Sequence, residues 1–156
     1  TGAACIMLCC NTAHLVANKL KQKLKVPLLH IAEEAAKEIE KHNMRKVGLL
    51  GTKFTMEHAF FVNCLNDAGI ETIISGTIER TLIHTAIVEE LAIGKLSAKS
   101  REMFLLVIKD LKEKGAEAVV FGCTEIGLFI SQSECELKIL DTTIIHAKAA
   151  VDFALS

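Results

Sequence analysis

Two cysteines stand at matching places in two similar stretches of the chain, and thiols placed in this way can move protons. Cys10 ends an apolar stretch that begins after Gly2, and Cys123 ends one that begins after Gly115; each cysteine lies eight positions beyond its glycine. Two thiols at equivalent places in two copies of one unit could face each other across a cleft. Such a pair suits proton exchange on both faces of one carbon, because one sulfur acts as base while the other acts as acid.

Short polar side chains follow both cysteines. Asn11-Thr12 comes after the first cysteine and Thr124-Glu125 after the second. Each pair lies where a strand is predicted to give way to a helix, and the backbone N–H groups of such a junction favour anions. We therefore expect the pKa of the Cys10 thiol to lie below the ~8.5 of free cysteine, and Cys123 occupies the same kind of junction. For either motif alone, a buried cysteine beside a helix cap is an equal alternative; the coincidence of two such motifs favours function.

A third polar motif follows another predicted strand, at residues 51–55. Its glycine, Gly51, would form a turn, and the hydroxyls of Thr52 and Thr55 would face a ligand there. The motif has neither the spacing of a P-loop nor that of a dinucleotide fingerprint, which disfavours nucleotide binding. The alternative is that Thr55 only caps the helix that follows.

The other cysteines and most histidines are predicted to be structural. We interpret Cys5, Cys9 and Cys64 as core residues, Cys135 as a surface or loop thiol, and His14, His30, His58 and His84 as surface or core side chains. No CxxC pair exists and the histidines complete no zinc spacing, so no metal site is expected. Free thiols indicate a reducing compartment, and we expect a cytoplasmic protein.

Apolar segments alternate with helical ones, which positions these motifs. Strands are predicted at residues 4–9, 27–30, 46–50, 70–74, 118–121 and 138–140, and helices at 12–25, 32–42, 56–68, 82–93, 97–114, 125–130 and 142–155, with a loop at 75–80. Gly69 is expected in a left-handed cap, Ser97 as a helix cap, and Asp141 or Thr142 as the cap of the last helix. Strands separated by helices of this length predict an α/β fold with a largely parallel sheet and helices on both sides.

The repeat extends beyond the cysteines. Residues 28–30 resemble 139–141 at an offset of 111, close to the offset of 113 between the two cysteines. The strand and turn at 46–55 precede Cys123, and the same offset places their counterpart before Thr1. We therefore expect two pseudo-symmetric lobes, the first of them incomplete: residues 1–43 with 142–156, and residues 44–141.

Composition limits the classes of function. The 156 residues are 51% hydrophobic and 24% charged, with a net charge of −1, which is typical of a globular protein. No basic block or aromatic stripe is present, so nucleic-acid binding is not expected. The apolar runs are too short to cross a bilayer, so no membrane association is expected.

Cys10-Asn11-Thr12-Ala13-His14 and Gly122-Cys123-Thr124-Glu125-Ile126 together resemble the aspartate/glutamate racemase family, on its aspartate and broad-specificity branch. Residues 48–56 resemble the second-lobe turn of that family, and 83–94 resemble its helical stretch. The resemblance covers essentially the whole chain.

The resemblance implies an amino-acid racemase that needs neither pyridoxal phosphate nor another cofactor. Cys10 and Cys123 would be its two proton-transfer residues, acting in turn as thiolate base and thiol acid. The substrate carboxylates would be held by Asn11, Thr12, Thr52, Thr55 and Thr124, and the protein would form a homodimer. The chain departs from the family at Cys9, where proline is usual, and lacks the glycine-rich strand and turn that open the first lobe.

Two alternatives remain open. A related isomerase or decarboxylase that uses one cysteine would leave the other dispensable. A non-catalytic fragment that binds a dicarboxylate would be stabilised by its ligand without exchanging the Cα proton.

Overall fold

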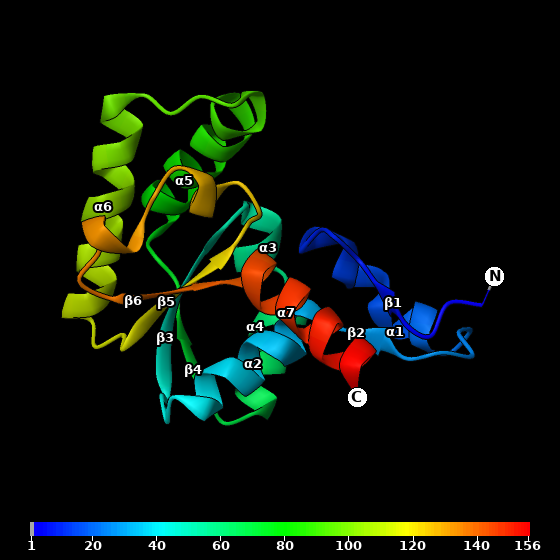
Figure 1. Cartoon of the computed structure of the whole chain (residues 1–156). Coiled ribbons are helices and arrows are strands. Elements are labelled where there is room, and N and C mark those ends of the chain that lie inside the picture. Colours follow the sequence, from blue (N-terminus) through cyan, green and yellow to red (C-terminus); the bar gives the residue numbers. More distant parts are fainter. Residues whose placement is uncertain (1) are drawn as a thin grey trace.

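A computed structural model describes residues 2–156 (Figure 1). Its elements, with η marking 3-10 helices, are β1 (Ile6–Met7), η1 (Thr12–Val16), α1 (Ala17–Lys21), β2 (Leu28–Leu29), α2 (Ile31–Lys41), β3 (Lys46–Gly51), α3 (Lys53–Glu57), α4 (Ala59–Asp67), β4 (Glu71–Ile73), α5 (Thr77–Glu89), η2 (Leu91–Ile93), α6 (Ala98–Glu113), β5 (Ala118–Gly122), η3 (Ile126–Leu128), η4 (Gln132–Glu134), β6 (Lys138–Asp141) and α7 (Thr142–Leu155).

Four parallel strands form the main sheet, in the order β4-β3-β5-β6. The two central strands are almost entirely buried, and their apolar residues show no alternation, as expected of strands covered on both faces. Their register pairs Gly51 with Gly122 at the carboxyl ends. The prediction of an α/β fold with a parallel sheet is confirmed.

Helices cover both faces of this sheet. The chain moves from β3 through α4 to β4 in one direction, and then returns through α5 and α6 to β5 in the other. Because both crossovers are right-handed in nearly all proteins, α4 belongs to one face and α5 and α6 to the other. The core between these layers contains fully buried aromatic side chains from each, among them Phe61 of α4 and Phe104 of α6.

The first part of the chain forms a separate two-stranded parallel sheet, in which Ile6 pairs with Leu28 and Met7 with Leu29. Helix α7 leaves the main sheet after β6 and packs against α2 and β2, so the end of the chain returns to its beginning (Figure 1). The division into lobes at residues 43/44 and 141/142 stays a prediction.

Several predicted elements are shorter or begin elsewhere. The strand predicted at 4–9 is only Ile6–Met7, because its one neighbour, β2, follows Pro27 and offers two paired residues. The helix predicted at 12–25 is the η1–α1 segment and ends at Lys21, and the one predicted at 125–130 is reduced to η3. The helix predicted at 56–68 begins at Lys53 and is interrupted at His58, whose backbone is extended.

The loop predicted at 75–80 is wrong from Thr77 onwards, where α5 begins. Arg80 holds this turn, since its guanidinium donates to the Ser75 carbonyl at 3.0 Å and forms an ion pair with Glu57. The predicted caps are confirmed: Gly69 has a φ of +72°, Ser97 accepts from the Ser100 N–H, and Asp141 accepts from the Thr143 N–H.

Candidate active site

The polar motifs of the second half meet at the carboxyl edge of the main sheet. Thr52 follows β3 and Cys123 follows β5, and these strands are neighbours. The chain leaves β3 towards β4 but leaves β5 towards β6, so the two strands flank the point where the strand order reverses. In open parallel sheets this point is where ligands bind, because the helices that follow the two strands diverge to opposite faces.

Two glycines let the ends of these strands approach each other. A Cβ added to Gly51 would lie 2.9 Å from the Gly122 carbonyl oxygen, and one added to Gly122 would lie 2.8 Å from Thr55 Cγ2. The Thr55 side chain therefore fills the space that a side chain at position 122 would need. Thr55 is fully buried there, which leaves Thr52, half-buried, as the more accessible hydroxyl of this motif.

Thr52, and not Thr55, caps the helix that follows β3. Its hydroxyl accepts from the Thr55 N–H at 3.4 Å and lies 3.4 Å from the Thr55 hydroxyl. The alternative that Thr55 is the cap is therefore wrong by a shift of three residues, since the helix begins at Lys53.

Cys123 is 7% exposed, and its thiol donates to Glu125 Oε2 at 2.9 Å. The Thr124 hydroxyl donates to the same oxygen at 2.8 Å. Burial raises the pKa of Cys123 to about 12, and the hydrogen bond to Glu125 acts in the same direction. A lowered pKa was expected of Cys10; at Cys123, in the same kind of junction, burial and the Glu125 carboxylate act in the opposite direction.

Glu125 is held as a carboxylate. Partial burial alone would raise its pKa, but the hydrogen bonds from the Cys123 thiol and the Thr124 hydroxyl outweigh burial and lower it. The second cysteine motif therefore contains one buried thiol and one ionised acid that share a hydrogen bond.

Cys10, by contrast, is exposed, after β1 and before η1. Asn11, the residue after it, is tied through Thr142 to Phe121 on the strand that ends before Cys123. The structure thus brings the two cysteines of the repeat to one region, although they stand in different surroundings.

Asn11 links the two cysteine motifs through a chain of hydrogen bonds. Its Nδ2 donates to the Thr142 hydroxyl at 3.1 Å, which donates in turn to the Phe121 carbonyl at 2.7 Å. A carbonyl only accepts, so the direction of this chain is fixed and Asn11 must offer its N–H₂ end to Thr142. Its Oδ1 is buried and has no partner among the described residues. The side chain therefore has an acceptor without a protein partner, and the role of Asn11 in holding a substrate carboxylate stays a prediction.

The rings of three histidines, His14, His30 and His146, lie close together beside the first cysteine motif. His14 Nε2 accepts from the Ile31 N–H at 3.2 Å, so its Nδ1 carries the proton and donates to the Cys10 carbonyl at 3.0 Å. The ring centroid of His14 lies 4.6 Å from that of His30 and 5.8 Å from that of His146. His14 and His30 were expected at the surface or in the core, and the structure places both in the core, since both are buried.

Burial lowers the pKa of both His14 and His30, that of His30 to about 4. His146 was missed by the sequence reasoning. It stands four residues after Thr142 on α7 and therefore on the same face of the helix, and this spacing is the signal that could have found it.

The remaining thiols lie outside this pair. Cys9 is exposed, contrary to the prediction of a core residue, because β1 ends at Met7 and leaves the chain uncovered beyond it. Cys5, Cys64 and Cys135 are half-buried. Burial raises the pKa of Cys64 to about 11.

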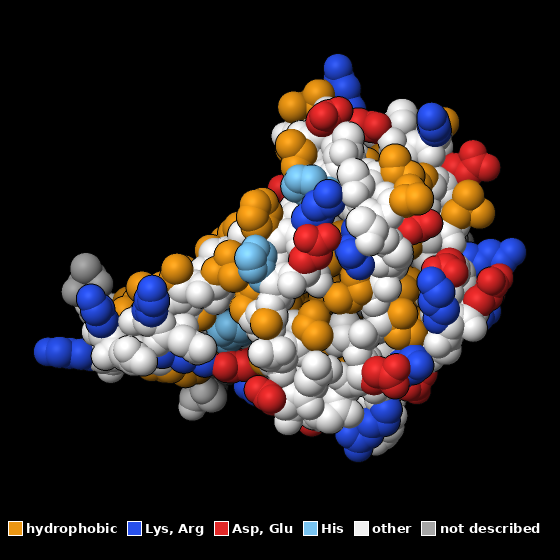
Figure 2. All heavy atoms as spheres, turned by 180° about the vertical axis from the view of Figure 1, so that it is seen from behind, with side chains coloured by type: hydrophobic (Ala, Val, Ile, Leu, Met, Phe, Trp, Pro, Cys, Tyr) orange, Lys and Arg blue, Asp and Glu red, His pale blue; other side chains and the backbone are white. Residues whose placement is uncertain are grey.

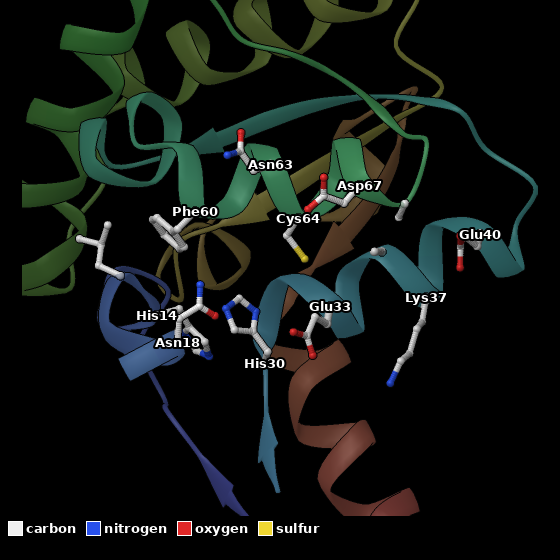
Figure 3. A pocket seen from close by; sticks show the side chains of 13 residues that line it. His14, Asn18, His30, Glu33, Lys37, Glu40, Phe60, Asn63, Cys64 and Asp67 are labelled. Atoms are coloured by element: carbon white, nitrogen blue, oxygen red, sulfur yellow. The ribbon is translucent and has the colours of Figure 1, made fainter. Parts of the chain in front are cut away.

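A groove with a volume of about 570 Å³ lies beside the first motif, between α2, α4 and the η1–α1 segment (Figure 3). His30, which precedes α2, and Glu33 of α2 face it from one side, and Asn63 and Cys64 face it from α4. Neither Cys10 nor Cys123 lines it, so it is distinct from the candidate site.

The molecular surface is hollowed between its narrow end and its wider body, and hydrophobic and histidine side chains gather along this hollow (Figure 2). Within residues 2–156, no cluster of three or more His, Cys, Asp or Glu side chains could hold a metal ion. None of the helices of the described chain has both the length and the apolar character needed to cross a bilayer.

Solved structures resemble this fold closely. A candidate Asp/Glu racemase from Yersinia pestis superposes with a TM-score of 0.95 at 41% identity, over 99% of this chain and 68% of that one. An aspartate racemase homologue from Pyrococcus horikoshii superposes with a TM-score of 0.90 at 35% identity, again over 99% of this chain and 68% of the other.

Sequence relatives point to the same family. The broad-specificity amino-acid racemase RacX of Bacillus subtilis is 27% identical over 156 residues, which is all of this chain and 67% of that protein. The glutamate racemase of Aquifex aeolicus is 27% identical over 158 residues, covering 97% of this chain and 59% of the relative. The chain thus spans about three fifths to two thirds of these relatives. Residues 1–150 match the Asp/Glu/hydantoin racemase family, and the chain belongs to that family.

Proposed function

We propose that the protein is an amino-acid racemase that moves the Cα proton between Cys10 and Cys123 without pyridoxal phosphate or another cofactor. The observation that carries this proposal is that hydrogen bonds from Asn11 through Thr142 to the Phe121 carbonyl join the residue after Cys10 to the strand that ends before Cys123. Membership of the family and the racemase activity of its relatives support the same reaction class.

The chemistry balances with two sulfurs alone. One cysteine, as thiolate, takes the Cα proton and becomes a thiol, and the electron pair of the broken C–H bond passes into the substrate carboxylate as an enediolate. The other thiol then gives its proton to the opposite face of Cα and becomes a thiolate. In the reverse direction the roles exchange, which is why two groups are needed on opposite faces.

Substrate recognition follows from the polar groups at the site. The unpartnered Asn11 Oδ1 accepts a hydrogen bond from the α-ammonium group. The Thr52 hydroxyl and the backbone N–H groups after Cys10 hold the carboxylates, whereas the Thr124 hydroxyl already donates to Glu125. These donors stabilise the negative charge that develops in the transition state. We propose aspartate, glutamate or a range of small polar amino acids as substrates, and a cytoplasmic homodimer as the working form.

The test is proton NMR in D₂O, which follows loss of the Cα–H signal for L- and D-aspartate, glutamate and a panel of other amino acids. We expect exchange in the wild type and a fall of about 10²–10⁴-fold in both Cys10→Ser and Cys123→Ser, the size typical for loss of an acid or base. Cys9→Ser is the matched control for the first motif, because Cys9 is adjacent and also exposed.

Other outcomes identify the alternatives. Full racemisation by either single variant would overturn the two-base mechanism and favour chemistry with one cysteine. Stabilisation by a dicarboxylate, without Cα exchange on any substrate in the folded protein, would indicate a binding fragment.

A further inference from the structure

We propose that Glu125 keeps Cys123 protonated in the resting protein, so that Cys123 is the waiting proton donor and Cys10 the waiting base. The assignment of acid and base rests on the proposed racemase function. The protonation of Cys123 rests only on the hydrogen bond between its thiol and Glu125, and it is tested below without any substrate.

The geometry requires a proton on the sulfur. Glu125 is an ionised carboxylate, which can accept hydrogen bonds but cannot donate one. The 2.9 Å contact between Cys123 Sγ and Glu125 Oε2 is therefore a hydrogen bond only while the sulfur carries its hydrogen. A thiolate at the same place would put two negative charges side by side in a largely buried site, which is unfavourable.

Thr124 fixes the carboxylate in this position. Its hydroxyl donates to the same Oε2 at 2.8 Å, so that oxygen accepts from both neighbours at once. Glu125 remains partly exposed at its other end, which lets water stabilise the negative charge. The acid is therefore held as an acceptor and aimed at the thiol.

The first motif has no equivalent of this acid. Two residues after Cys10 the chain has Thr12, whereas two residues after Cys123 it has Glu125. Cys10 is also exposed to water. The two motifs thus place their sulfurs alike, but only Cys123 has a carboxylate two residues along that accepts a hydrogen bond from its thiol.

Other ionisable groups lie on the flanking elements. Lys53 begins α3, Asp141 ends β6 and His14 lies on η1, and none of them is among the groups that shift the pKa of Cys123. Within the described chain, the groups that shift the pKa of Cys123 are Glu125 and Cys10. The Glu125 backbone N–H acts against its own side chain, and its effect is smaller.

The experiment measures the pH midpoint of modification at each cysteine. The folded chain is treated with methyl methanethiosulfonate from pH 6 to 11, and mass spectrometry follows the peptides that contain Cys10 and Cys123. In the wild type we expect Cys10 to react at a pH where Cys123 does not. In Glu125→Gln we expect the Cys123 midpoint to fall by at least about one pH unit, which is roughly a tenfold faster reaction at a fixed pH below it.

Glu134→Gln is the matched control. Glu134 is another hydrogen-bonded carboxylate beside a cysteine, and it raises the pKa of Cys135, but it is not among the groups that act on Cys123. This variant should leave the Cys123 midpoint unchanged. Gln has nearly the shape of Glu, so a shift confined to Glu125→Gln reports charge rather than a change in packing.

An unchanged or higher Cys123 midpoint in folded Glu125→Gln would overturn the proposal. If that variant does not fold, two other measurements decide the question. A Cys123 midpoint below that of Cys10 in the wild type would overturn the proposal. A Cys123 midpoint in Glu125→Asp that is not lower than in the wild type would also overturn it. A lowered midpoint in a protein that racemises nothing would leave Glu125 as the holder of the thiol proton and remove the racemase proposal alone.

Discussion

The two cysteine motifs occupy equivalent places in the repeat, yet their surroundings differ in almost every respect that controls a thiol. Cys10 is exposed, and its carbonyl accepts a hydrogen bond from the His14 ring. Cys123 is buried and faces a carboxylate. Symmetry of the chain therefore places the two sulfurs, while the local contacts of each decide which one holds a proton. A reaction that needs one acid and one base at a time benefits from this difference.

The segments that follow the cysteines keep the symmetry more closely. Strand β2 is followed by His30, whose ring accepts from the N–H of Ala32, and β6 ends at Asp141, whose carboxylate accepts from the N–H of Thr143. Each side chain thus caps the helix that it precedes, two residues along. Those helices, α2 and α7, pack against each other. The segments that follow the two cysteines are thus alike, while the groups around the two thiols differ.

The largest expected effect is a loss of folding stability at low pH, and it arises at His30, beside the first cysteine motif. Because burial lowers the folded-state pKa of His30 to about 4, against about 6.5 when unfolded, the unfolded chain binds more protons in that window. Stability is therefore full above about pH 6.5 and falls as pH drops towards 4, by up to about 3 kcal/mol from this residue. Urea denaturation of the wild type and of His30→Asn at pH 7 and 4.5 measures the effect.

An equal loss of stability in both proteins between these two pH values would contradict the assignment of the acid sensitivity to His30. Asn keeps a capping side chain at the start of α2 but has no proton to gain, so the variant should lose less on acidification. An equal loss would place the acid sensitivity elsewhere, for example in carboxylates of the second half.

The next effect concerns the link between the motifs. Thr142→Val removes the hydroxyl that joins Asn11 Nδ2 to the Phe121 carbonyl, and leaves a buried donor and a buried acceptor without partners. We expect a loss of about 2 kcal/mol in unfolding free energy, measured by urea denaturation. Thr143→Val, at an exposed neighbouring position, is the control. A loss below about 0.5 kcal/mol would mean that the two motifs do not depend on this link.

This link shows where sequence reasoning ends. The cysteines and the residues after them were found because identity and spacing repeat along the chain. Asn11 and Thr142 are 131 positions apart, and Thr142 was visible only as a candidate helix cap. A hydrogen bond over such a distance depends on how α7 returns to the first strands, which no local pattern encodes.

The burial of individual side chains is a second property that local sequence patterns do not predict. Parallel strands, helix order and caps such as Ser97 follow from local periodicity and propensity, and they were predicted well. The exposure of Cys9 and the raised pKa of Cys123 were not, because they depend on which elements cover each strand end. Glu125 was recognised as a neighbour of the thiol, but the direction of its side chain comes only from the folded structure.

A smaller loss of stability is expected when the residue directly before a cysteine is substituted, and it should differ between the two motifs. Gly122→Ala would place a Cβ 2.8 Å from Thr55 Cγ2 and 3.1 Å from Leu49 Cδ1. We expect it to destabilise the protein by about 1–2 kcal/mol, since these side chains must shift in a packed interior. Thr55→Ser removes the nearest methyl group, so the double variant should recover part of the loss. Purely additive losses would show that the clash with Thr55 is not the cause.

The smallest effect is expected at the equivalent position of the first motif. Cys9 precedes Cys10 as Gly122 precedes Cys123, but it is exposed, and its side chain therefore has little packing to lose. Cys9→Ala should change the unfolding free energy by less than about 0.5 kcal/mol, as exposed substitutions usually do. Thermal denaturation beside Gly122→Ala measures both under the same conditions. A loss at Cys9 as large as that at Gly122 would mean that another segment covers the first strand end in the native protein, and that the two sulfurs are more alike than their present surroundings make them.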